Sequence, residues 1–261
     1  MQPFHIISLN CKHELFPQKE AAFVRNERIL QYIKTINPIC AGLQEFTEQM
    51  HLNLQPQLEH YTIIGENRYA SNHVLNEQTA ILVNTQQAII LESKTIWLSA
   101  TPEKASRLFS SSMPRTCTMV KLQLIATGHE CYIFNVHLDV VLPYTRYKQA
   151  KILLQFMHEI YRHDPLPMIL MGDFNDHYHS KTIRLIQDHT SQNLFQLRDI
   201  YTTMNAIQST FRGLHSFLLD NTPIDYIFVT NDIAIHHAEV VSNFELPLSD
   251  HFPILAELSF Y

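Results

Sequence analysis

The sequence has few of the features that mark disulfide-rich or membrane proteins. Its four cysteines, Cys11, Cys40, Cys117 and Cys131, show no Cys-x-x-Cys spacing and lie in or beside predicted strands. Four in 261 residues argue against a disulfide framework and favour buried free thiols. No apolar stretch approaches the roughly 20 residues of a membrane span, and the N-terminus resembles no signal peptide. We expect a cytoplasmic monomer with no membrane partner, although a chain already trimmed of its signal would look the same.

The sequence also lacks a block rich in Lys or Arg. Its 19 Lys and Arg residues are outnumbered by 25 Asp and Glu residues, which gives a formal net charge of −6. Proteins held on nucleic acid by a broad basic surface have the opposite balance. A local basic groove on an acidic protein is still compatible with this composition. Nucleic acid is therefore a less favoured partner, but not an excluded one.

Helical and strand patterns alternate along the chain without repeats or a break in composition, which indicates a single domain over residues 1–261. Apolar spacing predicts helices at Pro17–Ile36, Thr47–Leu58, Pro143–Tyr161 and Ser180–His189. The clearest predicted strands are Phe4–Leu9, Ile39–Leu43, Tyr61–Ile64, Thr79–Val83, Ile89–Leu98, Thr116–Leu124, Cys131–Leu138, Met168–Met171, Ile224–Val229 and Phe252–Leu258. The pattern indicates sheets covered by helices.

Polar residues stand at or just past the ends of predicted strands, where α/β folds gather ligand and catalytic groups. They are Asn, Asp, Glu and His, the types that a hard metal ion and a phosphate ester require. The segments are Leu9-Asn10, Leu43-Gln44-Glu45, Val136-His137-Leu138-Asp139, Gly172-Asp173-Phe174-Asn175, Ile224-Asp225-Tyr226 and Ser249-Asp250-His251-Phe252-Pro253. Together they predict a metal-assisted site for a phosphate ester.

In this order, the segments resemble the endonuclease/exonuclease/phosphatase superfamily, which includes pancreatic deoxyribonuclease, exonuclease III and the inositol-polyphosphate phosphatases. Three further segments are similar to a compact bacterial branch: Trp97-Leu98-Ser99-x-Thr101-Pro102, Pro114-Arg115 and Thr210-Phe211-x-Gly213. The resemblance implies a four-layer α/β/β/α sandwich of two packed, mostly antiparallel sheets flanked by helices.

Glu45 is the main candidate ligand for Mg²⁺ or Mn²⁺, because it closes an apolar strand and these ions prefer oxygen ligands. Asn10 could add a carbonyl oxygen and Asp250 a second carboxylate. Taken alone, Glu45 could simply be an acid favoured at a helix N-terminus. No Cys/His cluster has zinc spacing, and the nearest pair, His177 and His179, fits a solvated loop.

His251 supplies an imidazole suited to proton transfer near neutral pH. The resemblance implies that Asp225 orients His251, that Asp173 orients or activates water, and that Asn175 binds a phosphate oxygen. Two residues apart on an extended stretch, Asp173 and Asn175 would point into one cleft. Whether Asp173 or His251 takes the proton stays open, and Gly172-Asp173-Phe174-Asn175 alone could be a plain turn.

His137 and Arg115 complete the candidate site. In deoxyribonuclease-like members a histidine at the position of His137 faces the phosphate and can protonate the leaving oxygen, whereas the abasic-site endonucleases typically carry tyrosine. A lone histidine in a strand could also be a core residue. Arg115 could form bidentate contacts with phosphate or be a solvated loop arginine. Lys12 stands where similar bacterial proteins often have arginine.

These residues predict a Mg²⁺- or Mn²⁺-dependent phosphoesterase that hydrolyses a P–O bond by in-line attack of water. A small phosphorylated molecule or phosphodiester is the favoured substrate. The alternative is a nuclease acting on DNA or RNA, which differs in substrate rather than chemistry. A non-catalytic binding module is disfavoured because every polar position is filled. A lipid phosphodiesterase has least support, since Trp97 is the single tryptophan and lies in a predicted strand.

Overall fold

The computed structural model describes residues 2–13, 22–188, 194–204, 207–213 and 222–261. Within these ranges two six-stranded sheets form the centre of the molecule. The first sheet has the order β11 (Ile233–Val240), β12 (Ile254–Phe260), β1 (Phe4–Asn10), β2 (Cys40–Phe46), β4 (Gln78–Asn84) and β3 (Tyr61–Ile64). The second has the order β5 (Ala88–Trp97), β6 (Thr116–Leu124), β7 (Glu130–His137), β8 (Met168–Asp173), β10 (Asp225–Thr230) and β9 (Leu197–Asp199).

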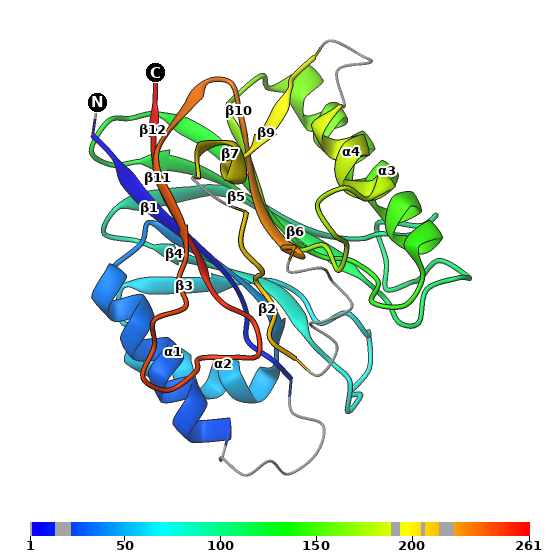
Figure 1. Ribbon diagram of the computed structural model, residues 1–261, viewed down its shortest axis with the longest axis horizontal. Coiled ribbons are helices and arrows are strands. Elements are labelled where there is room, and N and C mark those ends of the chain that lie inside the picture. The colour runs from blue at the N-terminus through cyan, green and yellow to red at the C-terminus, as the bar shows by residue number, and fades with distance from the viewer. Residues whose placement is uncertain (1, 14–21, 189–193, 205–206, 214–221) are drawn as a thin grey trace.

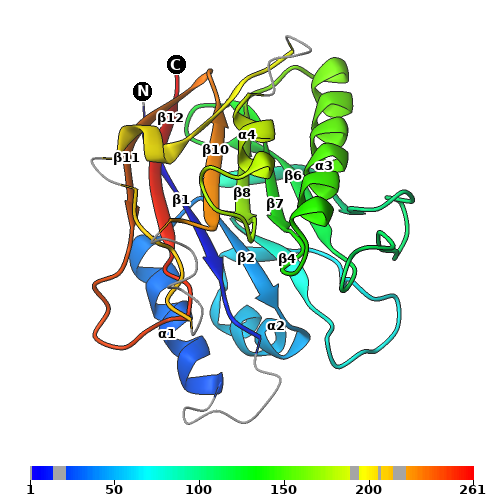
Figure 2. The ribbon, with the colours of Figure 1, turned by 45° about the vertical axis from the view of Figure 1, so that its right-hand side comes forward.

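The sheets are mixed but mostly antiparallel, because among the described strands only the pairs β1–β2 and β7–β8 run parallel. Helices α1 (Ala22–Ile36) and α2 (Glu48–Leu54) cover the outer face of the first sheet, while α3 (Pro143–His163) and α4 (Lys181–Gln187) cover the second (Figures 1 and 2). The expected four-layer sandwich is confirmed. No helix among the described residues is long and apolar enough to cross a membrane.

The side chains of each strand point alternately to the two faces of its sheet, and this divides the core into layers. In β1, Ile6 belongs to the cluster between the sheets, and Ile7 to the cluster beneath α1, which contributes Ile29 and Ile33. Successive strand residues face opposite sides, so a strand that is apolar throughout can pack on both. The four cysteines are free and buried, as expected.

The structure differs from the predicted elements at one helix and at two strands. The helix expected over Thr47–Leu58 ends at Leu54 and continues as a 3₁₀ turn at Gln55–Gln57, because Pro56 lacks an N–H and crowds the preceding turn. Strands β9 and β11 carry no clear apolar alternation; β11 is a half-exposed edge strand. The expected start at Pro17 and end at His189 of two helices lie outside the described residues.

Candidate active site

The two parallel strand pairs bring polar side chains to one edge of the sandwich. Asn10 lies opposite Gln44 at the ends of β1 and β2, and His137 lies opposite Asp173 at the ends of β7 and β8. Parallel neighbours end at the same edge of a sheet. The prediction that Asn10, Glu45, His137 and Asp173 stand at strand ends is confirmed.

Asp225 and His251 reach this edge with the opposite chain direction. Strand β10 is antiparallel to β8, with Asp225 opposite Asp173, and β12 is antiparallel to β1. Asp225 therefore opens β10, and His251 precedes β12, paired to Phe211 through an isolated bridge. The prediction that both residues stand at the ends of apolar strands is confirmed, and the structure adds that Asp225 and His251 lie at the strand starts, whereas Asn10, His137 and Asp173 lie where strands finish.

His251 and Asp225 form a buried pair. The Nδ1–H of His251 donates to Asp225 Oδ2 at 2.9 Å, which leaves Nε2 directed toward Asp173 Oδ2 at 3.8 Å. Burial alone would lower the pKa of His251, but the carboxylates of Asp225, Asp173 and Asp250 outweigh it and raise that pKa to about 10. The ring is therefore an imidazolium at neutral pH.

Asp173 lies at the centre of the site. Its Oδ2 accepts a hydrogen bond of 2.9 Å from Asn10 Nδ2 and lies 3.7 Å from His137 Nε2. Burial, reinforced by the nearby Asp225 carboxylate, raises the pKa of Asp173 to about 7. Gly172 allows this approach, because its φ is 146° and a Cβ there would lie 2.0 Å from the Val136 carbonyl oxygen.

Asn175 enters the same cavity by a route that differs from the extended stretch expected. Its φ is 50°, in the left-handed region, and its N–H donates to Asp173 Oδ1 at 2.8 Å. This local turn, typical of Asp and Asn, replaces the strand geometry. The side-chain amide of Asn175 donates to the Leu138 carbonyl at 3.1 Å, which leaves its second N–H for another acceptor.

Glu45 lies across the cavity from the histidines. Its backbone has a φ of 54° where the pairing of β2 with β4 is irregular. Oε1 accepts from Asn10 Nδ2 at 3.0 Å, and Oε2 accepts from the His13 N–H at 2.7 Å. Asn10 Oδ1 is engaged by the Lys12 N–H at 2.9 Å, so Asn10 presents its nitrogen to the carboxylates of Glu45 and Asp173.

Three polar residues that line this cavity were not among the candidates from the sequence: His13, Arg68 and Glu77. Glu77 accepts from His13 Nδ1 and from Arg68 Nη1, each at 2.7 Å, and all three side chains are largely buried. Because the His13 N–H also binds Glu45, this chain of contacts supports the Glu45 carboxylate. Arg68 and Glu77 belong to the polar loop Glu66–Glu77. A polar loop has no apolar periodicity, so the sequence pattern did not identify them as site residues.

The side chain of Arg115 is buried and lines the cavity. It is 4% exposed, so the solvated-loop interpretation was wrong. Its Nε has no hydrogen-bond partner, and no carboxylate pairs with it among the described residues. His137, 5% exposed, lies nearby. Burial, together with the charges of Arg115 and Arg68, holds the pKa of His137 well below its usual value, so this second imidazole is neutral.

The catalytic candidates line one cavity of about 490 Å³, which includes Glu45, Arg115, His137, Asp173, Asn175, Asp250 and His251. Asp225 lies behind His251. Asp250 contacts Lys12, with 3.5 Å between Oδ2 and Nζ. The residues of the predicted site are therefore brought together, from both sheets and from the loop before β12.

The donor set fits a hard divalent cation. Glu45, Asp173 and Asp250 offer carboxylate oxygens to the same cavity, and Glu45 has no cationic side-chain partner among the described residues. Mg²⁺ and Mn²⁺ favour such oxygen ligands. One ligand atom each from Asp173, Asp225 and His251 also lie within 4.8 Å of one another. We favour a hydrogen-bonded pair there, because Asp225 already accepts the Nδ1–H of His251.

Comparisons with known proteins agree with this geometry. An endonuclease/exonuclease/phosphatase from Bacteroides vulgatus is 26% identical with a TM-score of 0.86, covering 100% of both chains. The mannosyl-6-phosphatase of Bacteroides thetaiotaomicron VPI-5482 is 25% identical with a TM-score of 0.84, covering 98% of this chain and 100% of that one. D. rerio TDP2, complexed with a single-strand DNA product, shares the fold at 16% identity and a TM-score of 0.73, covering 99% and 100%.

The comparison with curated proteins gives no match. The model of the Endonuclease/Exonuclease/phosphatase family matches residues 7–251, nearly the whole chain. That range includes every residue of the cavity described above. The chain therefore belongs to the endonuclease/exonuclease/phosphatase family.

Proposed function

We propose that the protein is a metal-dependent phosphoesterase that hydrolyses a P–O bond by in-line attack of water, on a small phosphorylated molecule or phosphodiester. The observation that carries the proposal is the buried Arg115 guanidinium, which faces the cavity without a carboxylate partner among the described residues. An uncompensated guanidinium beside Asp173 and His251 suits a phosphoryl group and the water that attacks it.

Asp173 is the better candidate for the general base. A pKa of about 7 leaves much of Asp173 ionised at neutral pH, yet basic enough to accept a proton from water. His251 is already protonated, since its pKa is about 10, and so it cannot accept that proton. The role proposed for His251 is to donate from Nε2 to a phosphoryl oxygen, with Asp225 fixing the orientation of the ring.

Arg115 and the free N–H of Asn175 are proposed to bind the non-bridging phosphate oxygens. His137 is neutral in the free protein because burial, and then the charges of two nearby guanidinium groups, lower its pKa. A bound phosphate offsets those charges, so the pKa of His137 rises on binding. Protonated in this way, His137 can donate its proton to the leaving oxygen.

The proposed ligands of Mg²⁺ or Mn²⁺ are Glu45, with Asp250 and Asn10 as further oxygen donors. An oxygen from Asn10 requires its amide to turn over and to give up the bond from the Lys12 N–H. When bound, the ion supplies Lewis-acid stabilisation of charge on the phosphoryl group.

A nuclease is the second candidate, because the same groups would cleave a nucleic-acid phosphodiester. D. rerio TDP2, which has the same fold, is complexed with a single-strand DNA product. We rank the small substrate first because of the acidic net charge, −6, and because of the similarity to a mannosyl-6-phosphatase.

A substrate panel tests the proposal. Sugar phosphates, nucleotides, bis(p-nitrophenyl) phosphate and single- and double-stranded DNA and RNA are assayed with Mg²⁺, Mn²⁺ or EDTA. We expect metal-dependent turnover, with a small phosphate ester having the highest kcat/KM. Preferential turnover of DNA or RNA would establish the nuclease instead, and a chain inactive on every ester would contradict both.

The role of His137 is tested by varying the leaving group. His137→Ala should lower turnover at least about 10²-fold on an alkyl phosphate, whose leaving oxygen needs a proton. The loss should be smaller on a p-nitrophenyl ester, because nitrophenolate leaves without one. Equal losses on both substrates would show that His137 binds phosphate and does not protonate the leaving oxygen.

A further inference from the structure

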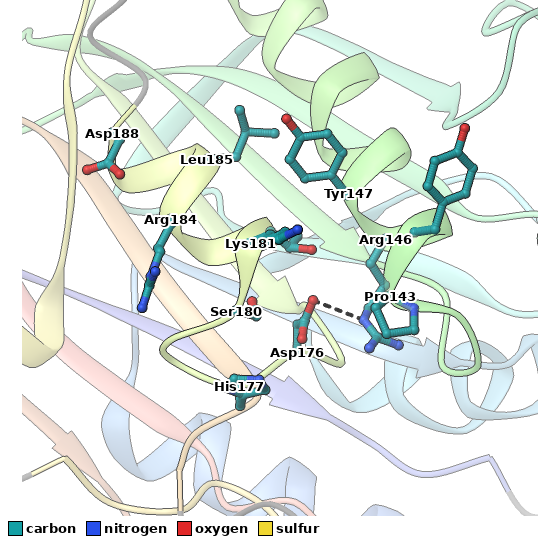
Figure 3. A pocket seen from close by; sticks show the side chains of 12 residues that line it. Pro143, Arg146, Tyr147, Asp176, His177, Ser180, Lys181, Arg184, Leu185 and Asp188 are labelled. Carbon is teal, nitrogen blue, oxygen red and sulfur yellow. Dashed lines mark ion pairs between the residues drawn. The ribbon is translucent and has the colours of Figure 1, made fainter.

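A second cavity, larger than the catalytic one, lies between α3 and α4. Its volume is about 930 Å³. Tyr144 and Tyr147 line it from α3, and Lys181, Arg184 and Leu185 line it from α4 (Figure 3). None of these residues takes part in the chemistry proposed above, and a groove of this size beside a catalytic site can hold part of a substrate.

The segment that follows β8 borders both the catalytic cavity and this α3–α4 groove. Asn175 lines the catalytic cavity, and Asp176, the next residue, lines the groove. Asp173 and Asp176 are three residues apart, so their Cα atoms are at most about 11 Å apart. The groove is therefore within reach of a substrate whose phosphate lies beside Asp173.

The groove is surrounded by unneutralised positive charge. Lys181 and Arg184 are exposed, and neither forms an ion pair among the described residues. On α3, Lys148 and Lys151 also lack such a partner; their Nζ atoms lie 5.4 and 6.0 Å from the ring centroids of Tyr144 and Tyr147. On a chain with a net charge of −6, two such cations that line the groove, with Lys148 and Lys151 near its tyrosine rings, favour an anionic ligand.

The groove also contains a buried polar group. Asp176 is 4% exposed, and its Oδ2 lies 3.1 Å from Arg146 Nε but accepts no hydrogen bond (Figure 3). Arg146 donates through Nη1 to the carbonyls of Asp139 and Val140, which holds the pair in place. A buried carboxylate oxygen with an open acceptor position suits a ligand hydroxyl group. Asp188 adds a second carboxylate at the rim.

We propose that the α3–α4 groove is a specificity subsite that holds the non-reacting end of the substrate: a hydroxylated ring that carries a second phosphate. This proposal rests on the phosphoesterase function proposed above. The hydroxyl group donates to Asp176, the ring packs on Tyr144 or Tyr147, and the second phosphate contacts Lys181 and Arg184. Sugar bisphosphates and nucleoside bisphosphates share this chemistry.

The test reverses the charge of the subsite without touching the catalytic cavity. Lys181→Glu/Arg184→Glu changes two exposed side chains of α4, and Lys34→Glu, on an exposed position of α1, is the control for added negative charge. Fructose 1,6-bisphosphate and adenosine 3′,5′-bisphosphate are compared with the matching monophosphates. Binding is measured by calorimetry in EDTA, and kcat/KM with Mg²⁺.

We expect the wild type to bind at least one bisphosphate about tenfold more tightly than its monophosphate, equivalent to about 1.4 kcal/mol. The double variant should lose that preference while its kcat/KM on the monophosphate stays within about twofold of the wild type. The bisphosphate that is preferred identifies the ring as a sugar or a nucleoside. The Lys34→Glu protein should match the wild type.

Equal binding of bisphosphates and monophosphates by the wild type would overturn the subsite. So would a preference that survives the double charge reversal, or much tighter binding of a single-stranded oligonucleotide than of either bisphosphate. The calorimetric measurement of binding needs no turnover, so it tests the subsite separately from the proposed phosphoesterase function. If the protein hydrolyses no ester but the variant still loses bisphosphate binding, the subsite stands and the catalytic function fails.

Discussion

The pairing of His251 with Asp225 determines the charge of the histidine that is proposed to act in catalysis. The carboxylate lies 2.9 Å from Nδ1, and the pKa of His251 is about 10, above its usual value. A raised pKa means that the protonated ring is favoured in the folded protein at every pH below about 10. This is the state needed to donate from Nε2 toward a phosphoryl oxygen.

Asp225→Asn keeps the shape of the side chain and removes its charge. In metal-free protein, the pKa of His251, measured by NMR titration of the ring, should fall from about 10, because the largest opposing charge has gone. We expect a large fall in kcat and a lower midpoint of urea unfolding at pH 7, because a raised folded-state pKa means that this pair stabilises the folded protein. A histidine pKa that does not move would show that Asp225 does not control the ring.

The two residues should also act as one unit. A double variant, Asp225→Asn/His251→Ala, should be scarcely less active than His251→Ala alone. Once the imidazole of His251 is removed, Asp225 has no ring to orient, so its own loss costs little more. Kinetic comparison of the two single variants with the double variant measures this. Losses that multiply would mean that Asp225 works independently of His251, on metal or on substrate.

At this scale the sequence predicted which residues lie together better than it predicted the contacts that they make. All nine candidate site residues lie at or beside one cavity, because strand-end polar residues of the right types stand out from apolar runs. Their partners were not predictable. Arg68 and Glu77 both lie in the loop before β4, and only the packing of β4 beside β2 brings them to His13.

Asp139 links the loop before Arg115 to the segment that leads into α3. Its carboxylate accepts hydrogen bonds from Ser111 Oγ, from the N–H and Oγ of Ser112, and from the N–H groups of Val141 and Leu142. It thereby fixes the loop before Arg115 to the start of α3. Although burial acts the other way, these hydrogen bonds hold the pKa of Asp139 below its usual range.

Asp139→Asn should destabilise the protein by about 2 kcal/mol or more at pH 7, because an amide cannot accept all of these bonds. A depressed folded-state pKa gives stability that is complete above the unfolded value near about 4 and is lost as pH falls through the folded value. The difference between the wild type and the variant, measured by urea unfolding, should therefore shrink below about pH 4.

The exposed Asp232→Asn protein is the matched control, with a free energy of unfolding like that of the wild type at each pH. A difference between the wild type and Asp139→Asn that stays constant from pH 7 to pH 2.5 would contradict the role of the ionised carboxylate.

Elements were predictable where apolar periodicity was strong. The strand from Thr116 to Leu124 and the α3 stripe of Ala150, Leu154 and Met157 lie as expected, since each packs on the core. Edge strand β11 was not predictable, because an edge buries little and its mixed Ile233–Val240 sequence carries no alternation. Strand direction at Asp225 and His251 also depends on pairing across the sheet, which no local pattern encodes.

For the whole molecule, the charge distribution predicts weak binding to duplex DNA. The net charge is −6, and the sequence has no block rich in Lys or Arg that would form a broad basic face. Each neutralised phosphate contributes nearly one unit to the slope of log K against log salt. We expect weak binding with a shallow slope in a fluorescence titration; tight binding with a slope near about −5 would establish the nuclease.

The central claim, a divalent metal held by Glu45 for phosphoester hydrolysis, is tested most directly by one titration. Turnover of the best ester in the panel is measured against Mg²⁺ and Mn²⁺ concentration for the wild type, for Glu45→Gln and for the exposed control Glu48→Gln. We predict that EDTA abolishes activity, that Glu45→Gln needs much more metal for a lower maximal rate, and that Glu48→Gln matches the wild type. Activity that survives both EDTA and Glu45→Gln would contradict the account.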